Sequence, residues 1–361
     1  MNENLTNQAM TQFRFLWVIP EKTDLNDACY LARVYYPHLR LQEYGISSRI
    51  ITESSDISEY HEADVVIFHR TTLNMSEVSK LGKVIGIDLM DDLFRYKYIK
   101  ADQDFLLTDS LPNARFYHSR NTYYWPHAFN IHDDIDFSES KDDVVNFVYC
   151  GNAGNVQCLL GAPLNALERL GKERAVKLTI ITNIKTAESQ SWIGRLPDIK
   201  PENYSLEWIE FDIKTYEHHM KQCDVGYFPQ DIQKDRWKKK SIYKTAHASS
   251  IGLPAIVSPT EEAFSTYTHR LNCMIAYSEE DWYRAAKQMA DPVFRGTIKA
   301  NAVELCKLKF NFDLICNQLL GIAEIYLKRK RESRIYRKLV RHSAYFLLKV
   351  EHYIRAIKKR L

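Results

Sequence analysis

The sequence predicts an α/β protein built from two doubly wound domains, each with a parallel, Rossmann-like sheet. From Phe13 onward, short apolar runs alternate with stretches of helical periodicity, the pattern of strands joined by crossover helices. A polar, acidic stretch at 129–145 interrupts the alternation, and a second alternating series begins at Asn146. The length of 361 residues also favours two domains, at about 150 residues per domain.

In the first half of the chain, short apolar runs bounded by turn residues predict buried strands. The expected strands are 13–20, 48–52, 64–70, 83–89 and 105–108. Helices are expected at about 27–44, where Gly45 stops the periodic pattern, and at 111–117. These elements form the predicted first domain, residues 1–135.

The second half repeats the alternation with different residues, and no sequence repeat relates the two halves. The expected strands are 146–150, 176–182, 205–211, 225–229, 254–258 and 273–277, and the expected helices include 159–170, 216–222 and 280–290. The predicted second domain is 136–327, which ends with a helix at about 310–327. Parallel sheets bind ligands beyond the carboxyl ends of their strands, so we expect the binding site in a cleft that the two domains face.

Composition excludes several classes of protein. Hydrophobic residues make up 45% and charged residues 26% of the chain, which is ordinary for a globular protein and excludes a disordered one. No run of about 18 apolar residues predicts a transmembrane helix. The seven cysteines include no C-x-x-C pair, which argues against a thiolate zinc site and fits reduced thiols in a cytoplasm.

The net charge of +3 conceals a basic C-terminal tail. Residues 328–361 hold 13 Lys and Arg against 2 acidic residues, a net charge of +11, and the rest of the chain carries −8. Apolar residues recur in the tail at helical spacing: Ile335, Leu339, Phe346, Val350, Tyr353, Ile354 and Ile357. This pattern predicts a basic amphipathic helix on an anionic membrane surface. The alternative is packing against the acidic body or an oligomer partner; nucleic acid is a poorer partner, because no reader motif is visible.

The run 238–259, KKKSIYKTAHASSIGLPAIVSP, carries the strongest chemical signal. Ser241 is the expected N-cap of a short helix that Gly252 ends. Lys240, Lys244 and either His247 or Ala248 would share one helix face. A helix N-terminus beside two lysines predicts an anion site. The alternative is a solvated basic loop before an ordinary buried helix.

The pattern K-S-x-x-K-x-x-H-x-x-x-x-G-L-P-A-I-V-S-P resembles the donor-binding segment of GT-B glycosyltransferases of the group 1 (family 4) type. Those retaining enzymes usually carry two glutamates eight residues apart here, and the matching positions hold Lys239 and His247 instead. The resemblance covers roughly residues 146–325. It implies that Lys240, Ser241, Lys244 and His247 contact a nucleotide-sugar donor.

A second segment carries the same resemblance. Residues 149–155, YCGNAGN, follow the first strand of the second domain and resemble the glycine loop that opens this domain in those transferases. Gly151, Asn152, Gly154 and Asn155 are therefore expected at the donor diphosphate, where glycines permit close backbone approach. The alternative is a plain turn between a strand and a helix.

Strand ends of the first domain supply acceptor-side candidates. Asp88, Asp91 and Asp92 follow one strand, and a carboxylate there could orient or deprotonate an acceptor hydroxyl. His69 and Arg70 end another strand, where His69 could contact a sugar hydroxyl and Arg70 a phosphate. The catalytic candidates are therefore Asp88, Asp91, Asp92 and His69. The alternatives are a helix cap for the aspartates and structural pairing for His69 and Arg70.

Together these features predict a cytoplasmic glycosyltransferase, peripheral on the inner face of the plasma membrane. It would move a sugar from a nucleotide-sugar donor to a saccharide or lipid-linked acceptor, in surface polysaccharide synthesis. No cofactor and no metal site is expected, since no second set of metal ligands accompanies the three aspartates. Retention of anomeric configuration is implied by the resemblance alone. The alternatives are a nucleotide-sugar epimerase on the same fold and a catalytically inactive binding subunit.

Overall fold

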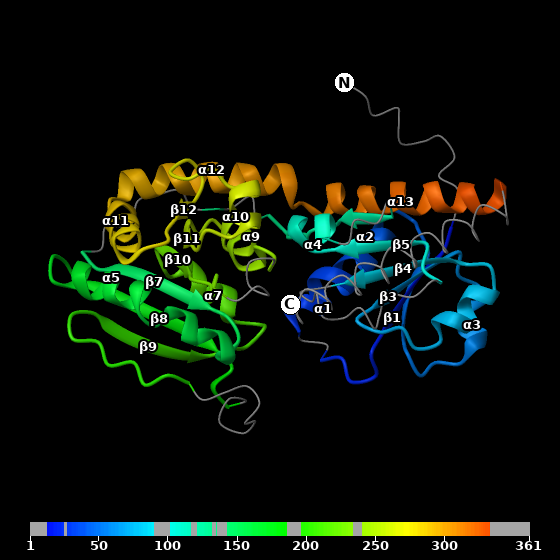
Figure 1. Cartoon of the computed structure of the whole chain (residues 1–361), viewed down its shortest axis with the longest axis horizontal. Coiled ribbons are helices and arrows are strands. Elements are labelled where there is room, and N and C mark those ends of the chain that lie inside the picture. The colour runs from blue at the N-terminus through cyan, green and yellow to red at the C-terminus, as the bar shows by residue number, and fades with distance from the viewer. Residues whose placement is uncertain are drawn as a thin grey trace, which may run out of the picture. The chain divides into compact units, whose positions relative to one another are not determined.

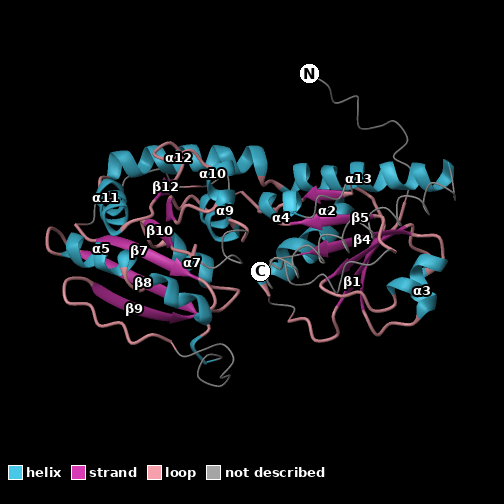
Figure 2. Ribbon diagram, in the orientation of Figure 1, coloured by secondary structure: helices cyan, strands magenta, loops and turns pink. Residues whose placement is uncertain are grey.

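The computed structural model describes residues 13–24, 27–89, 102–116, 121–131, 135, 143–185, 196–233 and 240–332. The chain divides into two compact units. Unit 1 contains the residues up to Ala128 together with those from Phe312 onward, and unit 2 contains Phe129–Asn311. Each unit holds one six-stranded sheet whose paired strands are all parallel (Figures 1 and 2). The two predicted doubly wound sheets are therefore confirmed.

The sheet of unit 1 has the strand order β2-β1-β3-β4-β5-β6. Its strands are β1 (Phe15–Ile19), β2 (Ser48–Thr52), β3 (Val65–His69), β4 (Val84–Leu89), β5 (Phe105–Thr108) and β6 (Thr122–Tyr124). Its helices are α1 (Ala28–Tyr30), the π-helical η1 (Leu31–Tyr35), α2 (Tyr36–Glu43), the 3-10 turn η2 (Ile57–Tyr60), α3 (Met75–Lys80), α4 (Leu111–Phe116) and α13 (Phe312–Glu332). Every residue of β1, β3, β4 and β5 is buried, as expected for strands covered on both faces.

Alternate residues of β1 belong to two different cores, because successive side chains of a strand point to opposite faces. Trp17 packs with Val34 and with Leu319 of α13 on one face. Leu16 and Val18 pack with Val78 of α3 on the other. Each fully buried aliphatic side chain contributes about 1.5–3 kcal/mol relative to its exposed state, so the apolar strands commit unit 1 to a covered sheet.

Helix α13 is the last described element and packs on the sheet of unit 1. The indole of Trp125 donates to the backbone carbonyl of Ile315 at 2.9 Å, and Tyr326 lies against Phe105 with ring centroids 5.4 Å apart. Arg40 and Tyr44 both bond to Asp313 in its first turn. The part of the predicted tail beyond Glu332, including its amphipathic stripe from Ile335, lies outside the described residues.

The sheet of unit 2 has the strand order β12-β11-β10-β7-β8-β9. Its strands are β7 (Val145–Cys150), β8 (Val176–Thr182), β9 (Ser205–Glu210), β10 (Val225–Phe228), β11 (Ala255–Val257) and β12 (Met274–Ile275). Its helices are the 3-10 η4 (Ala153–Leu159), α5 (Ala162–Gly171), α7 (Tyr216–Lys221), α9 (Tyr243–Ser250), α10 (Glu261–Thr266), α11 (Glu279–Met289) and α12 (Pro292–Lys309).

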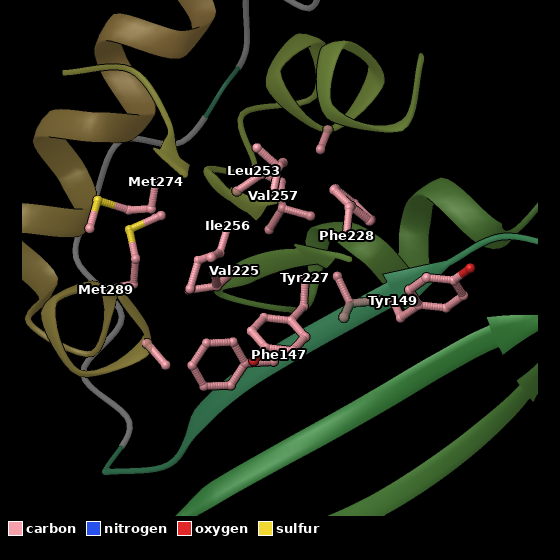
Figure 3. Packing of buried hydrophobic residues seen from close by; sticks show 14 of the residues in the cluster. Phe147, Tyr149, Val225, Tyr227, Phe228, Leu253, Ile256, Val257, Met274 and Met289 are labelled. Atoms are coloured by element: carbon pink, nitrogen blue, oxygen red, sulfur yellow. The ribbon is translucent and has the colours of Figure 1, made fainter. Parts of the chain in front are cut away.

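The core of unit 2 is dense in aromatic and aliphatic side chains. Figure 3 shows Phe147, Tyr227 and Ile256 from the central strands packing toward Met274 and Met289. The rings of Phe147 and Tyr227 meet edge to face at 5.5 Å, and the Tyr227 hydroxyl donates to the backbone carbonyl of Pro163 at 2.7 Å. The buried hydroxyl is thus satisfied, which removes the cost of placing a polar atom in this core.

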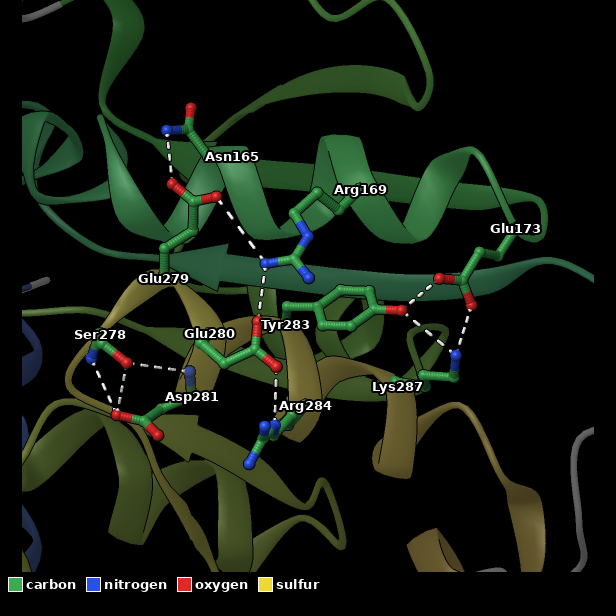
Figure 4. A network of polar contacts seen from close by, with 10 residues as sticks. All are labelled: Asn165, Arg169, Glu173, Ser278, Glu279, Glu280, Asp281, Tyr283, Arg284 and Lys287. Atoms are coloured by element: carbon green, nitrogen blue, oxygen red, sulfur yellow. Dashed lines mark hydrogen bonds and ion pairs between the residues drawn. The ribbon is translucent and has the colours of Figure 1, made fainter.

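Polar side chains on α5 and in the turn after it contact side chains of α11 (Figure 4). Arg169 contacts both Glu279 and Glu280, and Glu173 accepts hydrogen bonds from Tyr283 and Lys287. A capping box between Ser278 and Asp281 begins α11. The network sets the orientation of two helices on the unit 2 surface.

Several local expectations needed correction. The helix predicted at 27–44 is interrupted by the π-helical segment η1, and no pattern predicted the three-residue strand β6 or helices α3, α10 and α12. Ser241 is not the N-cap of α9: the helix begins at Tyr243, and Ile242 precedes it without a side-chain cap. Gly252 does end the helix, with φ of +76°.

Candidate functional site

The first candidate site lies where β7 ends in unit 2. Lys244, in the first turn of α9, donates from Nζ to the Tyr149 hydroxyl at 2.9 Å, and Nζ lies 4.4 Å from the centre of the Tyr149 ring. A Cβ on Gly151 would lie 2.2 Å from the same Nζ. Only glycine therefore leaves room for the ammonium at this strand end. Gly151 and Lys244, which the sequence analysis predicted separately and which are 93 positions apart, are therefore neighbours in the structure.

The amides of the glycine loop make bonds within the protein. Gly151 donates its N–H to Ile181 O at 3.1 Å, and Ala153 donates to Asn183 Oδ1 at 2.9 Å. Asn152 caps η4, since its side chain accepts from the Gly154 amide and its carbonyl accepts from the Asn155 amide, both at 2.9 Å. Four amides of the loop are thus engaged, and the positive charge at this strand end comes from Lys244.

The remaining donor-side candidates lie around α9. Lys240 is half-buried and Ser241 is buried, and both precede the helix rather than sharing its face.

The thiol of Cys150, the last residue of β7, stays protonated at neutral pH. Burial raises its pKa to about 12, although the positive charge of Lys244 acts to lower it.

His247 is enclosed by aromatic rings. Its ring lies parallel to that of Tyr243, with centroids 6.0 Å apart and planes 5° apart, and it also contacts Tyr216 and Phe129 at 5.3 and 5.6 Å. Its Nε2 lies 2.9 Å from Glu217 Oε1 and 3.2 Å from the Tyr216 hydroxyl. Only 6% of His247 is exposed, so Glu217 is the more accessible member of this pair.

The second candidate site lies in unit 1, where β3 and β4 end. The parallel register places His69 beside Asp88, and His69 Nδ1 donates to Asp88 Oδ2 at 2.7 Å. Arg33, from the π-helical η1, bonds to both carboxylate oxygens, donates to the carbonyl of Trp125 and stacks on its ring at 4.3 Å. All three charged or polar groups are buried, and π-helical turns often occur at functional sites.

The charges of this cluster set its protonation. Burial raises the pKa of Asp88, but the Arg33 guanidinium and His69 together lower it further, leaving it below its usual range and the carboxylate ionised. Burial lowers the pKa of His69 more than Asp88 raises it, so the imidazole is neutral at pH 7. Because Nδ1 carries the proton shared with Asp88, Nε2 is the unprotonated nitrogen. Among the described residues, no hydrogen-bond partner reaches this buried atom.

Two further residues flank the cluster. Arg70 has a positive φ of 56°, a backbone conformation that L-residues rarely adopt, and pairs with Asp27 at 3.0 Å. His127 is buried nearby, and burial followed by the charge of Arg33 holds its pKa well below the ordinary value. Asp91 and Asp92, the other predicted catalytic candidates, lie outside the described residues.

The described residues contain neither a candidate metal site nor a helix that could span a membrane. Within the part of the chain that the structure describes, no group of three or more His, Cys, Asp or Glu side chains could hold a metal ion. No helix among these residues is long and apolar enough to cross a membrane.

Sequence reasoning missed Arg33, Tyr149, Asn183 and Glu217. Arg33 and Glu217 stand in helical stretches as ordinary charged residues, and Tyr149 reads as a core residue of its strand. Arg33 lies 55 positions from its partner Asp88, and Tyr149 lies 95 positions from Lys244. Glu217 and Asn183 each lie 30 positions from their partners, His247 and Ala153. Nothing in the sequence marks such pairs, because only the folded register brings them together.

No protein-family profile and no curated protein matches this sequence. Solved structures do resemble it in fold. Anabaena HepE in complex with UDP-glucose superposes with a TM-score of 0.54 at 14% identity, covering 87% of this chain and 99% of HepE. An α-glucosyltransferase bound to UDP and DNA gives 0.59 at 10% identity, covering 87% of this chain and 100% of its own. Sucrose-phosphate synthase from Thermosynechococcus elongatus gives 0.58 at 11% identity, covering 89% and 100%. These likenesses show that the chain has the GT-B fold.

Proposed function

We propose that this chain, which has the GT-B fold, is a glycosyltransferase that uses a nucleotide-sugar donor. The observation that carries the proposal is the Lys244 ammonium, held over Gly151 by Tyr149 at the end of β7. Similar folds that have been solved hold UDP or UDP-glucose, which makes a uridine diphosphate sugar the first donor to test.

Unit 2 would bind the donor and stabilise the leaving group. Transfer breaks the bond between the anomeric carbon and the diphosphate, whose oxygen keeps the electron pair and gains negative charge. A preorganised ammonium is worth more against this developing charge than against the ground state. Tyr149 fixes Lys244 before the substrate binds, so little reorganisation is needed. We propose that Lys244 supplies this stabilisation without a cofactor or a metal ion.

Unit 1 would supply the acceptor-side group. Both oxygens of Asp88 already accept hydrogen bonds, so Asp88 would orient His69 rather than act as the base itself. His69 Nε2, neutral and unprotonated, would accept the proton of an acceptor hydroxyl as the new glycosidic bond forms. The proposal requires the acceptor to reach this enclosed atom, which makes His69→Gln a direct test of it.

A panel of nucleotide sugars tests the proposed donor class, since a ligand that binds the folded state raises the melting temperature.

We expect Lys244→Ala to lower kcat/KM for transfer by about 100-fold or more, the scale of losing one transition-state charge contact. Lys177→Ala is the matched control, because Lys177 is an ion-paired lysine of the same unit, 37% exposed, on strand β8. Near-wild-type turnover by a folded Lys244→Ala protein would contradict the assignment.

Product analysis separates the proposed enzyme from its alternatives. A transferase yields free nucleoside diphosphate and a glycosylated acceptor, an epimerase yields an altered nucleotide sugar, and an inactive binding subunit yields neither. The resemblance implies retention of anomeric configuration, and NMR of the product's anomeric proton measures this directly.

The acceptor and the place of action are proposed from sequence. The net charge of +11 in residues 328–361 favours a lipid-linked or membrane-associated saccharide acceptor, as in surface polysaccharide synthesis. We propose that this tail holds the protein on the inner face of the plasma membrane.

A further inference from the structure

Arg33 is a buried cation of η1, the π-helical turn between α1 and α2 (Figure 1). Its guanidinium bonds to both oxygens of Asp88, from Nε to Oδ2 at 3.1 Å and from a second nitrogen to Oδ1. The third nitrogen donates to the backbone carbonyl of Trp125, and the guanidinium lies over the Trp125 ring at 4.3 Å. The side chains of Arg33 and Asp88 have no exposed surface. This two-point contact fixes the plane of the carboxylate as well as its charge.

A second buried pair gives the structural counterpart. Arg295 of α12 lies 3.1 Å from Asp224, with side chains 10% and 9% exposed, and it also donates to a backbone carbonyl at 3.0 Å. The other oxygen of Asp224 accepts the amide of Asn146 at 2.9 Å. Neither of these partners changes its protonation near neutral pH. Asp88 differs, because its Oδ2 also accepts a hydrogen bond from His69, at 2.7 Å.

The state of His69 depends on several charges that act on it together. Among the described residues, the charged or titratable groups that act on this ring are Asp88, Arg33, Arg70 and His127. Burial lowers the pKa of His69 most, Asp88 raises it, and Arg70 and Arg33 lower it. Arg70 pairs with Asp27 at 3.0 Å, so an acid outside the cluster offsets its charge. Arg33 is the cation that bonds to Asp88 directly.

We propose that Arg33 is the positioning residue of the His69 base: it holds the Asp88 carboxylate in place and offsets its charge, so that Nε2 of His69 carries no proton. Asp88 without Arg33 would still orient the ring, but a lone buried negative charge is costly and attracts a proton from solvent. Either this proton binds His69 and forms the imidazolium, or it binds Asp88, whose hydroxyl then donates to Nδ1 while the ring hydrogen moves to Nε2. Both states remove the acceptor atom. This inference rests on the proposed function, in which Nε2 accepts the proton of the acceptor hydroxyl.

The test follows the proton on the ring of His69. Arg33→Met should place a proton on Nε2 at pH 7, where the wild-type ring carries its hydrogen on Nδ1. Nitrogen chemical shifts of the histidine rings distinguish these states, and the His69→Gln protein identifies the signals of His69. The UDP dissociation constant should not change, because Lys244 belongs to unit 2.

The pH profile of transfer supplies a second measurement. In Arg33→Met a cation no longer opposes the proton, so the acid limb of kcat/KM should move to higher pH. We expect kcat/KM at pH 7 to fall by about 10- to 100-fold, a fraction of what a general base contributes. Arg33→Lys keeps the charge but loses the two-point contact, so it should restore the acid limb and leave kcat below the wild-type value.

Two further variants control for damage to the fold. Arg295→Met breaks the matched buried pair in unit 2 and should alter neither the ring signals of His69 nor the acid limb. The double variant Arg33→Met, Asp88→Asn leaves no buried charge unpaired, so it should fold even where Arg33→Met does not. Because the carboxylate that attracts the proton is gone, its acid limb should not move to higher pH.

The outcomes separate this inference from the proposed function. If Arg33→Met keeps the wild-type ring signals and acid limb, or if the double variant moves the acid limb to higher pH, this inference is wrong and the proposed function stands. If His69→Gln transfers sugar as fast as the wild-type protein, the proposed base fails first and takes this inference with it.

Discussion

At the scale of single residues, the lack of a side chain at Gly151 decides how the proposed donor site is built. Because Gly151 has no side chain, the Lys244 ammonium can lie against the ring and the hydroxyl of Tyr149. The cation is held by a hydrogen bond and by the ring face at once, which costs lysine its usual rotamer freedom. In the proposed function, this fixed ammonium is the group that meets the donor diphosphate.

Gly151→Ala should separate stability from donor binding. The new Cβ would meet the end of a flexible lysine rather than rigid backbone, so the side chain can move aside and the melting temperature should change little. Displaced from Tyr149, the ammonium loses its fixed position, and we expect UDP to bind at least about 10-fold more weakly. Differential scanning fluorimetry and titration calorimetry measure the two effects. Unchanged UDP affinity in the alanine variant would mean that the position of Lys244 does not matter.

At the scale of elements, the C-terminal turn of α9 determines how this helix joins the sheet of unit 2. Gly252 donates to Ser249 O at 3.1 Å and Leu253 donates to Ala248 O at 2.8 Å, the paired bonds of a Schellman motif. The turn sends the chain directly into β11, whose residues are buried. Helix, turn and strand together hold the segment from Lys244 to His247 at the sheet edge.

Two glycine substitutions in unit 2 should shift stability in opposite directions. Gly252→Ala forces a side chain into a φ of +76° and places Cβ 2.5 Å from Ile135 Cγ2, which should cost about 1–3 kcal/mol. Gly296 lies inside α12, and beyond the backbone of its own helix and its chain neighbours no atom lies within 4 Å of its would-be Cβ. Gly296→Ala should therefore stabilise by about 0.5–1 kcal/mol. Urea denaturation measures both. If the two variants unfold at the same urea concentration, the expected difference between the left-handed Gly252 and the helical Gly296 is wrong.

At the scale of the whole molecule, buried titratable groups make stability depend on pH. His69 and His127 are held neutral, with pKa values below the value of about 6.5 that they regain on unfolding. As the pH falls below about 6.5, the unfolded chain binds protons that the folded chain does not, which favours unfolding. Asp88 acts at much lower pH, because its pKa is already below the ordinary range.

We therefore expect the free energy of unfolding to fall between pH 7 and pH 5. Each histidine that stays neutral contributes at most about 1.4 kcal/mol per pH unit below its unfolded pKa. Urea titrations at pH 5, 6 and 7 measure the slope. Replacing His127 by Gln should reduce this slope, and equal stability at all three pH values would rule out the linkage.

The basic tail gives the second prediction at this scale. Residues 333–361 hold nine Lys and Arg and one Glu, a net charge of +8. Ending the chain after Glu332 keeps Lys330, whose ammonium lies 3.3 Å from the buried Asp104 carboxylate. This truncation should release the protein from anionic vesicles and leave UDP binding intact, and wild-type binding to vesicles should weaken with salt. Cosedimentation with the vesicles measures membrane binding at each salt concentration. If the truncated protein still sediments with the vesicles, the tail is not the anchor.

The sequence by itself determined the two parallel sheets, since apolar runs and helical periodicity are local patterns. It also located the end of α9 at Gly252, because a left-handed residue needs glycine. It selected His69 and Asp88 by their place at strand ends, Lys244 by its place on a short basic helix, and Gly151 by its place in a glycine loop after a strand. It could not predict β6, which is too short to show a pattern, or the π-helical turn that carries Arg33.

Only the tertiary structure decided which of these side chains meet. Register puts His69 beside Asp88, and Arg33 reaches them across 55 positions of sequence. Folding likewise joins Lys244 to Tyr149 and His247 to Glu217, and it buries His247 so that the carboxylate is left accessible. Local sequence fixes what each segment becomes, because it sets backbone preference and the apolar face. Contacts between distant segments depend on how those faces pack, and packing is a property of the whole fold.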